Sequence, residues 1–128
     1  MNSMKEVMAF IRIDKMNQTK RALRDAGISS MTAIGSAYGR GKGLYDAKVL
    51  EGARNNSPEA LELLGKEPRL RPQRIISVVV PAKKVQIVVD TLIKANQTPA
   101  PGDGKIFVLP VADTIRVRTG ETGYTILD

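Results

Sequence analysis

Residues 74–95 read RIISVVVPAKKVQIVVDTLIKA, a stretch in which a strand, a proline and a helix follow one another directly. Residues 74–80 are almost continuously apolar and rich in β-branched side chains, which is typical of a buried strand, and Pro81 should end it. In residues 83–95 apolar side chains recur at intervals of three and four, which predicts a helix with one buried face. We therefore expect a strand followed directly by a helix that covers a sheet.

The same alternation recurs on either side of this stretch. Residues 7–13 predict a first strand, Asp14 is a candidate helix cap, and residues 16–26 predict a first helix that Gly27 should end. Further strands are expected at 31–38, 105–109 and 114–118.

This order of elements predicts an α+β fold. Two β-α-β units with right-handed crossovers form a ferredoxin-like βαββαβ sandwich, here with an extra C-terminal strand, in one domain over residues 1–128. The strands are apolar on both sides, so the sheet face away from the helices needs a cover. We expect an oligomer that buries sheet against sheet.

A long insertion interrupts the pattern between the two units. It opens with Gly39-Arg40-Gly41-Lys42-Gly43 and extends to about residue 71, rich in charge, Asn and Gly. Within it, Ser57-Pro58-Glu59 has the residues of a helix start, which predicts a short helix through Leu64. We expect this segment to face a partner.

The composition argues against an enzyme. The chain has no Cys and no His, which removes cysteine nucleophiles, the Ser-His-Asp triad and the commonest zinc ligands. No paired-carboxylate arrangement stands out. The absence of Cys, of a signal peptide and of an apolar run of about 20 residues predicts a cytoplasmic protein without a membrane span.

The net charge of +7 raises the alternative of a nucleic-acid-binding module, because RNA-recognition motifs share the ferredoxin-like topology. The positive charges are spread along the chain and form no basic arm. Such motifs stack bases on aromatics of two central strands, and here the strand at 105–109 offers only Phe107 and the first strand only Phe10. A small anionic ligand or an acidic partner fits the charge better.

An anion site is expected near the C-terminus. Gly102 and Gly104 allow close backbone approach, Lys105 follows directly, and Arg116 and Arg118 should project from one face of the predicted last strand. The run is not a Walker A motif, because Pro99 stands where that motif needs its first glycine and Ile106 where it needs Ser or Thr.

Two of these segments carry a resemblance to a known family. The runs Gly102-Asp103-Gly104-Lys105-Ile106-Phe107-Val108 and Ile115-Arg116-Val117-Arg118-Thr119-Gly120 are highly specific to the PII signalling proteins, which the chain resembles over nearly its whole length. The other matching pieces are Met4-Lys5, Leu23, Ala26-Gly27-Ile28, Met31-Thr32, Gly39-Arg40, Lys42-Gly43, Val79-Val80-Pro81, Asp90-Thr91-Leu92-Ile93 and Gln97-Thr98.

The resemblance implies a non-enzymatic sensor that assembles as a trimer. ATP and ADP would compete for a cleft between each pair of subunits, and 2-oxoglutarate would join ATP through Mg²⁺. The nucleotide-binding residues that it implies are Phe10, Met31, Thr32, Gly39, Arg40, Val79, Gly102, Asp103, Gly104, Lys105, Arg116 and Arg118.

The chain departs from the family at the effector half of this site. The glutamine that normally follows Gly-Arg is Gly41 here, and the lysine before the third strand is Gln73. Binding of 2-oxoglutarate in the usual way is therefore left open, with Lys42, Arg71, Arg74 or a partner subunit as substitutes for the missing side chains. The segment 39–72 is longer than the usual T-loop, and Tyr45 stands in a different context from the modified tyrosine.

A long T-loop without that tyrosine resembles the nitrogenase-associated PII paralogues of methanogenic archaea and some bacteria. These form mixed assemblies of paralogues that bind dinitrogenase, so a paralogue and dinitrogenase are the implied partners beside the chain itself. The alternatives are an ammonium channel or glutamine synthetase as the target.

Overall fold

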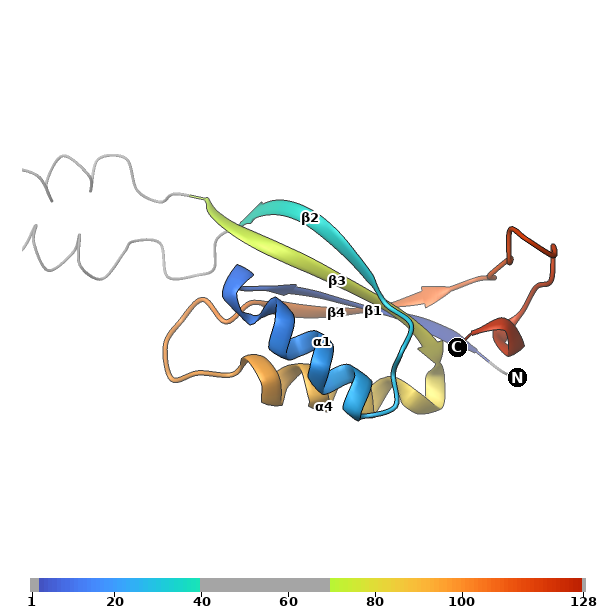
Figure 1. Ribbon diagram of the computed structural model, residues 1–128, viewed down its shortest axis with the longest axis horizontal. Coiled ribbons are helices and arrows are strands. Elements are labelled where there is room, and N and C mark those ends of the chain that lie inside the picture. Colours follow the sequence, from blue (N-terminus) through green and yellow to red (C-terminus); the bar gives the residue numbers. More distant parts are fainter. Residues whose placement is uncertain (1–2, 40–69, 128) are drawn as a thin grey trace, which may run out of the picture.

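The computed structural model describes residues 3–39 and 70–127, and in this part of the chain one antiparallel sheet carries two helices on one face (Figure 1). The strand order is β2-β3-β1-β4. The strands are β1 (Met4–Ile11), β2 (Thr32–Gly39), β3 (Arg71–Pro81) and β4 (Lys105–Val111), and the helices are α1 (Met16–Asp25) and α4 (Val85–Asn96). The predicted ferredoxin-like α+β fold is confirmed.

Each helix joins two strands that are not neighbours. β3 lies between β1 and β2, and β1 lies between β3 and β4, so each crossover skips one strand. Alternate residues of the two central strands point toward the helices and form the core. Its most buried members are Val7, Ala9, Leu23, Ile76, Val78, Val80, Val88 and Leu92.

The ends of α1 test two predictions about capping. Gly27 adopts φ 87°, its amide binds the Arg24 carbonyl, and the next amide, of Ile28, binds the Leu23 carbonyl at 2.8 Å. This is the Schellman arrangement, so Gly27 ends the helix as predicted. The predicted cap at Asp14 is wrong, because a 3-10 turn at Ile13–Lys15 leads into the helix and no side chain caps either element.

The strand boundaries differ from the sequence pattern by a few residues. β1 begins at Met4 and ends at Ile11, because Ile13 belongs to the 3-10 turn. β3 begins at Arg71, where it pairs with Gly39, so both ends of the expected 39–72 loop are strand. The rest of that loop, with the predicted short helix, lies outside the described residues.

The predicted strand at 114–118 is wrong. The segment makes a single bridge, between Ile115 and Thr122, and then turns back on itself. The Gly120 amide binds the Arg116 carbonyl at 2.7 Å, and Gly120 has φ 74°. Alternating apolar residues favour a strand only where a neighbouring edge can pair with it, and this segment extends beyond the sheet (Figure 1).

The sheet face away from the helices is apolar and uncovered in the single chain. Ile34, Phe107 and Leu109 are exposed by 43%, 49% and 38% of their surface. The register places Leu109 opposite Glu6, which accepts a 2.5 Å hydrogen bond from Ser77. A face of this kind is what the expected sheet-to-sheet assembly would bury.

Candidate functional site

The loop between α4 and β4 is held in shape by Asp103. Its carboxylate accepts hydrogen bonds from the backbone amide and the hydroxyl of Thr98, at 2.7 and 2.6 Å, and pairs with Arg12 at 3.0 Å. Arg12 also donates to the Pro101 carbonyl at 2.9 Å. The bonds from Thr98, aided by Arg12, lower the pKa of Asp103. The acidic side chain therefore fixes the loop from within.

The backbone of this loop requires glycine at two positions. Gly102 and Gly104 have φ of 101° and 112°, values that side chains rarely allow. A Cβ at Gly104 would overlap the Phe10 carbonyl oxygen, so the loop lies directly on the end of β1. At Gly102 the nearest atom would be the side-chain Nη2 of Arg12, at 3.3 Å. Because the backbone at Gly104 lies so close to β1, Lys105, which is exposed, is placed at the start of β4.

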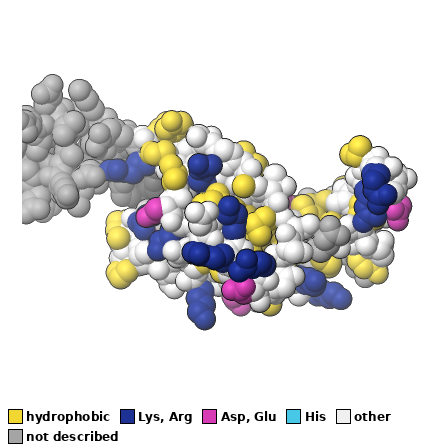
Figure 2. Space-filling model, in the orientation of Figure 1, with side chains coloured by type: hydrophobic (Ala, Val, Ile, Leu, Met, Phe, Trp, Pro, Cys, Tyr) yellow, Lys and Arg dark blue, Asp and Glu magenta, His cyan; other side chains and the backbone are white. Residues whose placement is uncertain are grey.

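The C-terminal segment presents the two arginines differently. Arg116 folds back, pairing with Glu121 at 3.0 Å and donating to the Ile126 carbonyl at 3.4 Å. The Thr119 hydroxyl and the Arg116 charge lower the pKa of Glu121. Arg118 is exposed and has no ion pair within the described ranges, and Val117 between them is 99% exposed. Figure 2 shows this loop as a tip carrying basic, acidic and apolar side chains.

The predicted phosphate-binding groups lie at opposite ends of one strand. Lys105 opens β4 beside Phe10, whereas Arg116 and Arg118 follow its far end at Val111 (Figure 1). Seven strand residues span about 23 Å. One small ligand therefore cannot touch both groups within a single chain.

The other predicted nucleotide-binding and effector residues that the structure describes lie at different positions along the strand direction of the sheet. Gly39 is next to Gln73, whose side-chain oxygen would lie 2.8 Å from a Cβ at that glycine, at the Lys105 end of the sheet. Thr32, which follows Met31, pairs with Ser77 in the middle of the sheet, and Val79 lies toward the C-terminal loop. The predicted residues Arg40, Gly41 and Lys42 lie outside the described part.

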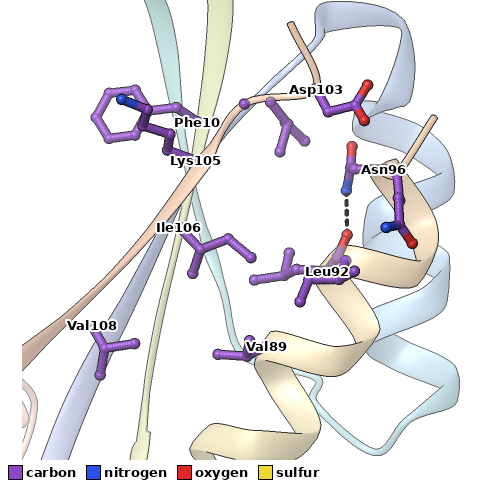
Figure 3. A pocket seen from close by; sticks show the side chains of 12 residues that line it. Phe10, Val89, Leu92, Asn96, Asp103, Lys105, Ile106 and Val108 are labelled. Carbon is purple, nitrogen blue, oxygen red and sulfur yellow. Dashed lines mark hydrogen bonds between the residues drawn. The ribbon is translucent and has the colours of Figure 1, made fainter. Parts of the chain in front are cut away.

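A cavity of about 330 Å³ lies between α4 and the first half of β4. Among the predicted residues it brings together Phe10, Asp103, Gly104 and Lys105. Figure 3 shows the Phe10 and Lys105 side chains on the far side of β4, pointing away from the cavity. Apolar side chains from α4 and β4 fill the view between helix and sheet.

Asn96, which was not among the predicted site residues, lines this cavity and is only 6% exposed. It follows Leu92 by four residues, so it occupies a position of the apolar stripe of α4. A polar residue at a stripe position was the available signal. Residues 3–39 and 70–127 contain no cluster of three acidic, His or Cys side chains, and none of their helices is long and apolar enough to cross a membrane.

Comparison with known proteins gives a consistent result. The family described as "Nitrogen regulatory protein P-II" matches residues 4–121. "Nitrogen fixation nifHD region GlnB-like protein 2" of Methanobacterium ivanovii is 43% identical over 122 residues, covering 94% of this chain and 96% of that protein. "Nitrogen regulatory protein P-II" of Rhodobacter capsulatus is 36% identical, with 94% and 96% covered.

The fold is also that of a solved structure. The crystal structure of Arabidopsis thaliana PII bound to citrate superposes with a TM-score of 0.71 at 29% identity, covering 98% of this chain and 90% of that one.

Proposed function

Because the chain belongs to the nitrogen regulatory protein P-II family, whose members are signalling proteins and not enzymes, we propose that it senses ATP and ADP in clefts between its own copies. Proteins of this family form trimers and bind small ligands such as ATP and 2-oxoglutarate. The observation that carries the proposal is the separation of the Lys105 loop from Arg118 along β4. When two copies pack head to tail, the Lys105 loop of one copy lies beside Arg118 of the other.

The chemistry of the two halves suits a nucleotide phosphate. The loop offers backbone amides around two glycines with positive φ and the ammonium of Lys105. Arg118, which has no ion pair among the described residues, offers a guanidinium that can make bidentate bonds to a phosphate. Arg116 is bonded to Glu121, and we assign it the role of shaping the loop that presents Arg118.

Bound ATP would bring Mg²⁺, which adds positive charge at the phosphates. Asp103 does not fit as its ligand, because both carboxylate oxygens already take bonds from Thr98 and Arg12. Gln73 offers an uncharged amide where the family has a lysine for the carboxylate of 2-oxoglutarate. The described residues therefore favour the nucleotide over 2-oxoglutarate as the ligand.

We propose nitrogenase as the regulated target and the cytoplasm as the site of action. Similar proteins from several methanogens are named for the nifHD nitrogen fixation region, which supports this choice. The segment 40–69, outside the described residues, is the part of the chain that we assign to target contact. The family match argues against the RNA-binding alternative, and the rings of Phe10 and Phe107 contact each other edge to face at 5.7 Å.

Capture of purified dinitrogenase by the immobilised chain tests the regulatory function. We expect capture to change between ATP and ADP, and we expect Arg118→Ala to lose that nucleotide dependence by weakening binding at least tenfold. Lys94→Ala, an equal loss of charge on the exposed surface of α4, should behave as wild type. Nucleotide-dependent capture of glutamine synthetase or an ammonium channel instead would overturn the target, and nucleotide-independent capture would overturn the sensor.

A further inference from the structure

Asn96 joins the two helices through a buried amide. Its Nδ2 atom donates to the Thr19 hydroxyl and to the Leu92 carbonyl, both at 3.0 Å. The Thr19 hydroxyl in turn donates its proton to the Lys15 carbonyl at 2.7 Å. Thr19 has no exposed surface, so the pair lies in the packed layer between α1 and α4.

This network fixes which way the amide points. Both partners of Nδ2 act as acceptors, because the Leu92 carbonyl has no proton and the Thr19 proton is already given to Lys15. Exchanging the amide oxygen and nitrogen would set Oδ1 against two acceptors, so that orientation is excluded.

The outward atom of the amide, Oδ1, is buried and has no hydrogen-bond partner in the described part of the chain. Asn96 lines the cavity between α4 and β4, and in Figure 3 its unbonded end points toward Asp103. Asp103 cannot satisfy it, because a carboxylate is also an acceptor and this one is bonded to Thr98 and Arg12. A buried acceptor without a donor costs about 1–3 kcal/mol.

The rest of the cavity is apolar and of useful size. Ile106 and Val108 of β4 face Val89 and Leu92 of α4 across it (Figure 3). Its volume of about 330 Å³ falls at the lower end of the range for small-molecule sites. Arg12 balances the charge of Asp103 at the rim, at 3.0 Å, and the Lys105 side chain points to the other side of β4, so the described lining gives the site no net charge to attract an ion.

We propose that this cavity binds a neutral, mainly aliphatic molecule with one hydrogen-bond donor, an alcohol or an amide, whose donor pairs with Asn96 Oδ1. The apolar walls take the aliphatic body, and the fixed amide selects the donor. The site is separate from the nucleotide cleft, because the Phe10 and Lys105 side chains point to the other side of β4. The proposal does not depend on nucleotide binding.

Three ring compounds of equal shape test this chemistry on the full-length protein. Cyclohexanol carries a donor, cyclohexanone carries an acceptor alone, and cyclohexylamine is a cation. We expect cyclohexanol to bind about tenfold more tightly than either, because only it pairs with Oδ1 without bringing a charge into an apolar site. Calorimetry gives the affinities, and methyl NMR shifts at Ile106, Val108 and Leu92 locate the compound.

Three variants distinguish the loss of the hydrogen bond to Oδ1 from a general loss of folding. Asn96→Leu should remove the tenfold preference for the alcohol over the ketone. Thr19→Val, the matched control, breaks the same helix junction but leaves Oδ1 in place, still oriented by the Leu92 carbonyl, so the preference should persist. Val108→Phe, which fills the cavity from β4, should abolish binding of all three compounds and stands as the test if Asn96→Leu does not fold.

Several results would overturn the proposal. These are equal affinity for alcohol and ketone in the wild type, a preference that survives Asn96→Leu, binding that survives Val108→Phe, or a cavity that holds ordered water and takes up none of the compounds.

Discussion

Gly104→Ala should abolish ATP binding and lower the free energy of unfolding by more than about 2 kcal/mol. The substitution combines two costs. Gly104 has φ 112°, where an alanine is strained, and the added Cβ would overlap the Phe10 carbonyl oxygen, a backbone atom of a central strand that cannot move aside. The loop would lift from β1 and carry Lys105 with it, and the phosphate half of the cleft would lose its shape.

Gly102→Ala is the control for this change. Gly102 has a similar φ of 101°, but its added Cβ would meet a side-chain atom, Arg12 Nη2, at 3.3 Å and no backbone atom. Both variants therefore carry the backbone strain of an alanine at positive φ, but only Gly104→Ala adds an overlap with a backbone atom. Urea unfolding and ATP calorimetry on both variants separate the two costs, and equal effects would show that the contact with Phe10 is unimportant.

Leu109→Lys should convert the assembled protein into single chains and remove nucleotide binding with it. Leu109 lies on the uncovered face of the sheet, 38% exposed in one chain. In the assembly proposed here that face packs against other copies, where an unpaired ammonium would be buried at a cost of several kcal/mol per chain. The single chain should still fold, because the new lysine lies opposite Glu6 on the neighbouring strand.

The matched control is Ile87→Lys on α4. Ile87 is 46% exposed, similar to Leu109, but lies on the helix layer. It receives the same new charge and should leave the assembly intact. Sedimentation equilibrium measures the mass of each, and a Leu109→Lys variant that keeps the mass of the wild type would show that copies meet through another surface.

The sequence pattern predicted those elements whose burial is periodic. The helices at Met16–Asp25 and Val85–Asn96 and the strands beside them follow from the spacing of apolar residues, and Gly27 from its need for positive φ. Residues 114–118 alternate in the same way and are not a strand, because no neighbouring edge pairs with them. A pattern along the chain carries no information on which edges are free.

The candidate site was predicted in its residue types but not in its roles. Asp103 was predicted as part of a loop that binds phosphate, whereas its bonds to Thr98 and Arg12 hold that loop in shape. The arginines appeared equivalent, but only Arg116 is bound to Glu121. The sequence marked Asn96 only as a polar residue on the apolar stripe of α4, and its partner Thr19, 77 residues away in sequence, became known from the fold.

The central claim, that each nucleotide site is shared between two copies, is tested most directly by mixing two defective chains. Lys105→Glu reverses the charge of the loop half, and Arg118→Glu reverses the charge of the arginine half. Either variant alone should fail to bind ATP, because every cleft contains one reversed charge. Both positions are exposed, so each variant should fold as the wild type does.

When the two variants are refolded together in equal amounts, random assembly pairs an intact loop with an intact arginine in about one quarter of the clefts. Calorimetry of the mixture should therefore recover ATP binding with wild-type affinity at about one quarter of the wild-type stoichiometry. A mixture that binds no more ATP than its two components do separately would contradict the shared site.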